Sequence, residues 1–146
     1  MLSRVDDLTS QPTAPPAMVV ARLRDVVIND EVHLPVRRGL PPRAFRRVLE
    51  YILAHLAEDI SNPVLAELVG LSPSHFSRAF KQSAGVSPHS YVLQSRVERV
   101  KHLLVETRLP LAQIAISVGF ADQSHCTRWF RELVGVTPGR FRWLNR

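Results

Sequence analysis

The sequence is short of cysteine, and that shortage excludes two kinds of site. Among 146 residues there is a single cysteine, Cys126. One cysteine cannot build a disulfide framework, which fits a reducing compartment. It also has no partner for a thiolate metal site, and the six histidines are scattered without ligand spacing. We therefore expect neither a metal nor a cofactor.

Long apolar runs are also missing. The N-terminal stretch MLSRVDDLTSQPTAPP has no apolar run of the kind that marks a signal peptide. The most apolar early stretch, residues 17–28, is interrupted by Arg22, Arg24 and Asp25. It falls short of the roughly 20 apolar residues that span a bilayer. We expect a cytoplasmic protein without a membrane partner.

The parts of an active site are absent as well. Residues 41–146 contain only two aspartates, Asp59 and Asp122, far apart in the sequence. They contain no glycine-rich phosphate loop and no nucleophile elbow. The chain is therefore expected not to be an enzyme.

Positive charge is what the chain does have, and it is concentrated. The formal net charge is +6. Residues 1–40 hold five arginines and five acidic residues, whereas residues 41–146 hold 14 Lys and Arg against 8 Asp and Glu. An excess of this kind indicates a polyanionic partner, either nucleic acid or a membrane surface.

The first 40 residues differ in pattern from the rest. Residues 1–17 carry three prolines among polar neighbours and are predicted to be a disordered tail. Apolar residues then recur at helical spacing over residues 18–28, which predicts one short helix. Two roles stay open for this helix: docking on the rest of the chain, and contact with another protein or a second copy. Residues 1–40 are thus predicted to be mostly a disordered tail or linker.

From Pro41 onward the pattern is helical. Proline follows a small polar residue four times, which is typical of an N-cap before proline in the first turn: Asn62-Pro63, Ser72-Pro73, Ser87-Pro88 and Thr137-Pro138. Four glycines mark helix ends: Gly70, Gly85, Gly119 and Gly135. We predict an all-α fold of about seven helices, with no strands: 42–58, 63–69, 73–84, 88–106, 110–118, 122–134 and 138–144.

Two stretches of the helical part are nearly the same. LSPSHFSRAFKQSAGVSP (71–88) and ADQSHCTRWFRELVGVTP (121–138) match at an offset of 50, with one residue added in the turn of the second copy. Each copy predicts a short helix, a turn with glycine and a longer helix. That is the helix-turn-helix plan, whose second helix enters the DNA major groove. Two units are too few for a solenoid.

The second helix of each copy has two faces. Apolar stripes at helical spacing are expected to be core: Phe76, Phe80, Ala84, and Cys126, Phe130, Val134. The opposite faces match position by position: Ser74, Ser77, Arg78, Lys81, and Ser124, Thr127, Arg128, Arg131. Arginine donates two hydrogen bonds to guanine, and hydroxyls contact phosphates or bases. We expect these faces to contact DNA. Trp129 and Trp143 are expected to be packing residues.

One helix is expected to join the two copies. Leu93, Val97, Val100 and Leu104 line one side of it. About 20 residues give roughly 30 Å, close to the ~34 Å between major grooves on one side of B-DNA. One chain is thus expected to serve two adjacent grooves. Arg96 and Arg99 on this helix are either phosphate contacts or partners of Glu98 or Glu106.

Over about residues 44–143 the sequence resembles the DNA-binding domain of the AraC/XylS-type transcription regulators. The matching segments are LAELVGLSPSHFSRAFKQSAGVSPHSYV, RVERVKHLL and IAISVGFADQSHCTRWFRELVGVTPGRFR. The resemblance implies seven helices in two helix-turn-helix subdomains joined by a long helix. The domain would be 41–146, with a first unit 41–86, a linker helix 87–107 and a second unit 108–146.

The resemblance also implies site residues. Base contacts would come from Ser74, Ser77, Arg78, Gln123, Ser124, His125, Thr127 and Arg128, with Lys81 and Arg131 nearer the DNA backbone. His75 and His125 lie at the edge of the outward faces, so a phosphate or packing role is open beside base contact. Cys126 and Val100 depart from the family pattern. Only 40 residues precede the domain, so no effector-binding domain and no small-molecule sensing are carried over.

The sequence therefore predicts a sequence-specific DNA-binding transcription regulator that inserts two recognition helices into adjacent major grooves. Its expected partner is double-stranded DNA, with RNA polymerase as a further candidate. It is expected to act in the cytoplasm, associated with the nucleoid, as a monomer or weak dimer. Two alternatives stay open: a non-specific nucleoid-type DNA binder, and a truncated regulator that acts mainly as a protein-interaction module.

Overall fold

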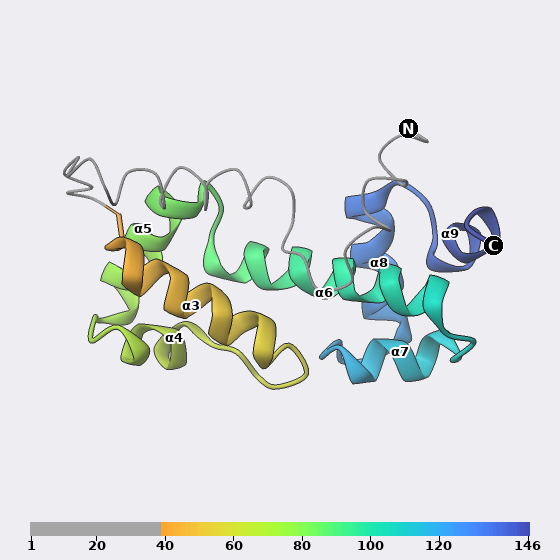
Figure 1. Ribbon diagram of the computed structural model, residues 1–146, viewed down its shortest axis with the longest axis horizontal. Helices are drawn as coiled ribbons and strands as arrows, with labels where there is room; N and C mark the ends of the chain where they lie inside the picture. Colours follow the sequence, from red (N-terminus) through yellow and green to blue (C-terminus); the bar gives the residue numbers. More distant parts are fainter. Residues whose placement is uncertain (1–38) are drawn as a thin grey trace. The chain divides into compact units, whose positions relative to one another are not determined.

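The computed structural model describes residues 39–146, and this part of the chain is helical with connecting turns (Figure 1). Its seven helices confirm the all-α prediction: α3 (Pro42–Ala54), α4 (Asn62–Leu68), α5 (Pro73–Ala84), α6 (Pro88–Glu106), α7 (Leu111–Ser117), α8 (Gln123–Val134) and α9 (Pro138–Leu144). The predicted tail at 1–17 and the predicted helix at 18–28 lie outside the described residues.

Proline and glycine set most of the helix boundaries, as predicted. The Ser72 hydroxyl accepts a hydrogen bond from the His75 N–H at 3.2 Å at the start of α5, and Thr137 does the same at the start of α9. The start of α4 differs, because Ser61 is the N-cap and Asn62 is already helical. A proline in the first turn tolerates either register, since its missing N–H would have no partner there.

The first helix is shorter than predicted, ending at Ala54 rather than at residue 58. The Arg96 guanidinium on α6 donates to the carbonyl of Leu56 at 3.1 Å and to that of Glu58 at 3.0 Å. These bonds hold residues 56–58 in a turn and satisfy their carbonyl groups outside the helix. Arg96 therefore has a structural role. Of the two acids considered as partners for Arg96, Glu98 instead pairs with Lys101 at 3.1 Å, and Glu106 lies 3.9 Å from His102.

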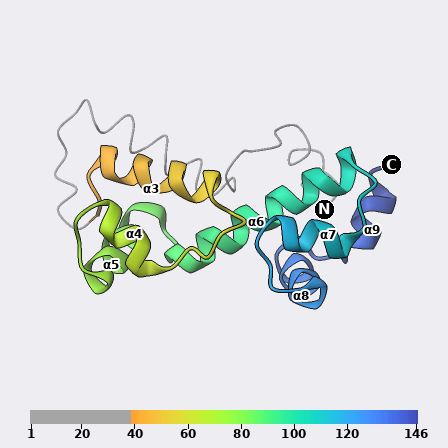
Figure 2. The same ribbon diagram turned by 90° about the horizontal axis from the view of Figure 1, so that it is seen from below.

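The described chain forms two compact units, and α6 contributes to both. The first contains residues 39–55 and 59–92. Its core is a set of aromatic rings around Phe80, whose ring centroid lies 5.6 Å from Phe45, 5.7 Å from Phe76 and 5.8 Å from Tyr91. In this unit α4 and α5 lie side by side (Figure 2). The buried face of α5 therefore fixes which face it leaves outward.

The second unit contains residues 56–58 and 93–146. The predicted stripe of the linker helix is buried in it, at Leu93, Val97, Val100 and Leu104. Phe130 on α8 meets Phe141 on α9 edge to face, with 5.4 Å between centroids. Cys126 is fully buried, and burial raises the pKa of its thiol to about 11. Its core role is thereby confirmed, since a thiol with that pKa is not a reactive thiolate at neutral pH.

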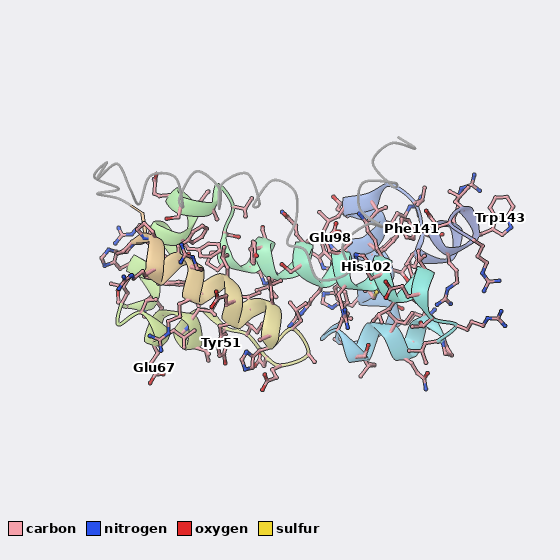
Figure 3. The ribbon with its side chains drawn as sticks, in the orientation of Figure 1. Tyr51, Glu67, Glu98, His102, Phe141 and Trp143 are labelled. Atoms are coloured by element: carbon pink, nitrogen blue, oxygen red, sulfur yellow. The ribbon has the colours of Figure 1, made fainter. Side chains whose placement is uncertain are left out.

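The turn between α6 and α7 is held by an arginine on α9. Arg142 donates from Nε to the Leu104 carbonyl at 2.9 Å and from Nη2 to the Leu109 carbonyl at 2.8 Å. Phe141 is buried, so Trp143, two residues further along the helix, lies on the opposite side of α9. Trp143 is 70% exposed and stands clear of the ribbon (Figure 3), so the prediction that it packs is wrong.

Replacing Arg142 with alanine is expected to lower the free energy of unfolding by about 2 kcal/mol, because a charged donor to backbone carbonyls is lost. Urea unfolding measures the change. The matched control is Arg140→Ala on the same helix, whose exposed side chain is expected to change stability by no more than about 0.5 kcal/mol. Equal losses in the two variants would contradict a specific role for Arg142.

Candidate nucleic-acid interface

The outward face of α5 is built by local signals. Ser72 caps the helix start, and Gly85 ends it in the left-handed region at φ 80°. With Phe76 and Phe80 turned into the core, the opposite residues face outward: Ser74, Arg78 and Lys81 are exposed and Ser77 is half-buried. We call these four residues the α5 outward face.

The outward face of α8 is built in the same way. Asp122 caps the helix, its Oδ1 accepting a hydrogen bond from the His125 N–H at 2.7 Å, and Gly135 ends the helix at φ 93°. Cys126 and Phe130 are buried. The residues we call the α8 outward face are Gln123, Ser124, Thr127, Arg128 and Arg131, of which Thr127 alone is half-buried.

The structure gathers the α8 outward face around one hollow. The hollow is lined by all five residues of that face together with Glu132 and Gly135. Glu132 was missed as a site residue. The signal for it was its spacing, because it lies four residues after Arg128 and such residues are neighbours on a helix surface. The matching position in α5 is Gln82, so the two faces differ in one acidic charge.

The two matched histidines are placed differently. His75 is exposed beside the α5 outward face. The His125 ring instead lies edge-on to Phe120, with 5.4 Å between centroids, and its Nδ1 is buried with no hydrogen-bond partner among the described residues. His125 thus packs within its unit. Base or phosphate contact by either histidine stays a prediction.

The cations of the two outward faces are not engaged in ion pairs within the described part of the chain. No ion pair within residues 39–146 involves Arg78, Lys81, Arg128 or Arg131. The Arg128 guanidinium carbon lies 5.7 Å from the centre of the Trp129 ring, and Trp129 packs against the core, as predicted. Four cations without a carboxylate partner form a surface suited to phosphates and to the acceptor edges of bases.

Each outward face follows a short helix and a turn. The turns span residues 69–72 and 118–122, so the second is one residue longer, as predicted. Gly70 and Gly119 have φ values of 68° and 101° in these turns. Helix, glycine-containing turn and longer helix make the helix-turn-helix motif, which occurs once in each unit.

Two further kinds of site, a membrane-spanning helix and a metal-binding cluster, are absent from residues 39–146. No helix there is both long enough and apolar enough to cross a membrane. Over the same residues, no three His, Cys, Asp or Glu side chains gather where they could hold a metal ion.

Comparison with known proteins agrees with this motif. A family model described as "Helix-turn-helix domain" matches residues 65–143. The arabinose operon regulatory protein of Salmonella typhimurium is 37% identical over 122 residues, which is 82% of this chain and 41% of that protein. The chain spans about two fifths of the length of that protein, of its Escherichia coli counterpart and of the probable transcriptional regulator LumQ of Photobacterium leiognathi.

Solved structures give the same result. The C-terminal domain of AraT, a response regulator from Geobacillus stearothermophilus, is 32% identical with a TM-score of 0.66, covering 69% of this chain and 84% of that one. The DNA-binding domain of AdpA, solved in complex with a target DNA, is 25% identical with a TM-score of 0.66, covering 69% of this chain and 91% of that one. Taken with the doubled motif, these matches show that the chain belongs to the helix-turn-helix family of AraC/XylS-type transcription regulators.

Proposed function

We propose that this chain is a sequence-specific DNA-binding regulator of transcription that inserts α5 and α8 into adjacent major grooves. The observation that carries the proposal is the match between the two outward faces. Each presents hydroxyls and two cations that have no carboxylate partner within residues 39–146, on the second helix of a helix-turn-helix motif. The related AdpA domain was solved on its target DNA, which supports the same partner here.

The residues divide into two roles. Arg78 and Arg128 donate to guanine O6 and N7, the commonest specific contact in the major groove. Lys81 and Arg131, one turn further along each helix, contact phosphates and set the position of the helix. The remaining residues contact bases or the sugar-phosphate backbone: Ser74, His75, Ser77, Gln123, Ser124, His125 and Thr127.

The wider function is part of the proposal. The chain acts without enzymatic activity on a site of roughly 20 bp, which is two turns of duplex. Residues 41–146 form the DNA-binding domain, with units at 41–86 and 108–146 and a linker helix at 87–107. RNA polymerase is a further partner, the protein acts as a monomer or weak dimer, and it is associated with the nucleoid.

Selection of bound sites from a random duplex pool tests the proposal. We expect a recurring site with two guanine-containing sub-sites. Arg78→Ala and Arg128→Ala are each expected to weaken binding by about 1–3 kcal/mol and to relax the preference at one sub-site. The matched control is Arg46→Ala, an exposed arginine on α3, which should leave the preference unchanged. Equal losses on random and selected DNA would show that Arg78 and Arg128 are backbone contacts.

The two alternatives have their own measurements. If unrelated duplex competes as well as the selected site, the protein is a non-specific binder. If the full chain binds a partner protein but not DNA, it is an interaction module. Comparing residues 41–146 with the full chain locates the binding activity in the proposed domain.

A further inference from the structure

We propose that Trp129 is a positioning residue for DNA recognition: its ring holds the Arg128 guanidinium ready for a base and away from Glu132. The inference rests on the proposed function, because it concerns the arginine assigned there to guanine. The two recognition helices are then not equivalent, although their arginines match in sequence.

Trp129 provides a fixed platform. Its side chain is half-buried and packs against the core cluster of the second unit, so the ring cannot turn freely. The Arg128 guanidinium carbon lies 5.7 Å from the ring centre, within the ~6 Å over which a cation is attracted to an aromatic face. Arg128 itself is exposed. The contact therefore orders the guanidinium without removing it from the surface.

Glu132 is the competitor that this contact opposes. It lies one helical turn after Arg128, at the i,i+4 spacing where opposite charges normally pair, and both residues line the same hollow. Yet no ion pair between them is present among the described residues. An ion pair at this spacing is weaker when the arginine precedes the acid than when the acid precedes the arginine. A modest cation–π attraction to Trp129 therefore outweighs it.

The α5 outward face lacks both groups. Arg78 is followed by Ala79, which is 2% exposed and offers no ring. Gln82 stands at the position of Glu132, so no acid lies at the i,i+4 position from Arg78. Arg78 thus serves as an internal control, since nothing that disturbs Trp129 should change its contact with DNA.

The experiment measures the Arg128 contact by removing the guanine atom that it binds. In the selected duplex, each guanine is replaced in turn by 7-deazaguanine, which lacks the N7 acceptor. The Kd of the full chain for the substituted duplex, divided by its Kd for the unmodified duplex, is the N7 penalty at that guanine. The guanine of Arg128 is the one whose penalty disappears in Arg128→Ala. The guanine of Arg78 is found in the same way with Arg78→Ala.

We expect Trp129→Leu to reduce the N7 penalty at the Arg128 guanine about twofold to fivefold, the size of an exposed cation–π contact. Trp129→Phe keeps an aromatic face and should retain an intermediate penalty. The double variant Trp129→Leu/Glu132→Gln should recover most of the lost penalty, because the competing carboxylate is gone. The penalty at the Arg78 guanine should stay unchanged in all three variants.

Other outcomes overturn the inference in distinguishable ways. If the wild-type chain selects no guanine, the proposed function fails and the inference fails with it. If the wild-type penalty is present but Trp129→Leu leaves it unchanged, the inference alone fails. Equal losses at both guanines, without recovery in the double variant, would show that Trp129 acts only through the fold. Trp129→Phe preserves most of the core volume, so it decides the question if the leucine variant unfolds.

Discussion

A Gly119→Ala variant is expected to lose at least about 3 kcal/mol of folding free energy. Gly119 lies in the turn before α8 at φ 101°, where a side chain is strained. The added Cβ would also overlap the Leu56 carbonyl oxygen and lie 2.8 Å from the Arg96 Nε. Since that carbonyl is backbone and accepts a hydrogen bond from Arg96, neither group can move aside cheaply.

Alanine substitutions at two other glycines distinguish the cost of backbone strain from the cost of steric overlap. Gly70 has a φ of 68° but nothing within 4 Å of an added Cβ, so Gly70→Ala should cost only about 1–2 kcal/mol of strain. Gly139 lies in α9 with open space and no positive φ, so Gly139→Ala should stabilise the protein by about 0.5–1 kcal/mol. Urea unfolding of the three variants gives the order. A loss at Gly119 no larger than that at Gly70 would contradict the close approach to Leu56.

Local signals explain why most of the fold could be predicted from the sequence. A proline after a serine or threonine and a glycine after an apolar run each act within a few residues, so α5, α6 and α9 have the predicted bounds. The errors arose where distant residues decide. The end of α3 depends on Arg96, 40 residues from Leu56.

The candidate site shows the same division. Helical periodicity predicted which side of α5 and α8 is outward, because a 3.6-residue repeat fixes the opposite of a buried stripe. It could not predict the stack of Arg128 on Trp129, since adjacent residues do not share a face and their contact depends on side-chain rotamers. Periodicity also could not predict that His75 and His125 have different surroundings, because only the fold places Phe120 beside the His125 ring.

Salt is expected to weaken the proposed complex steeply. Two cations of the outward faces are assigned to phosphates, Lys81 and Arg131, and neither pairs with an acid within residues 39–146. If each neutralises one phosphate, the two together contribute about −1.8 to the slope of log K against log salt, and raising salt from about 50 to about 200 mM lowers affinity about 12-fold through them alone. Binding titrations on the selected duplex across that range measure the slope.

A charge-removing double variant tests which cations contribute to that slope. Lys81→Gln/Arg131→Gln removes the two proposed phosphate contacts and should make the slope shallower than that of the wild type by about 1.8. Because phosphates are the same at every base pair, the selected sequence should not change. The matched control is Arg46→Gln on α3, which removes one exposed charge and should leave the slope as it is. If the double variant kept the wild-type slope, Lys81 and Arg131 would not lie on the DNA backbone. If it changed the selected sequence instead, they would contact bases, and the division of roles along each recognition helix would have to be reversed.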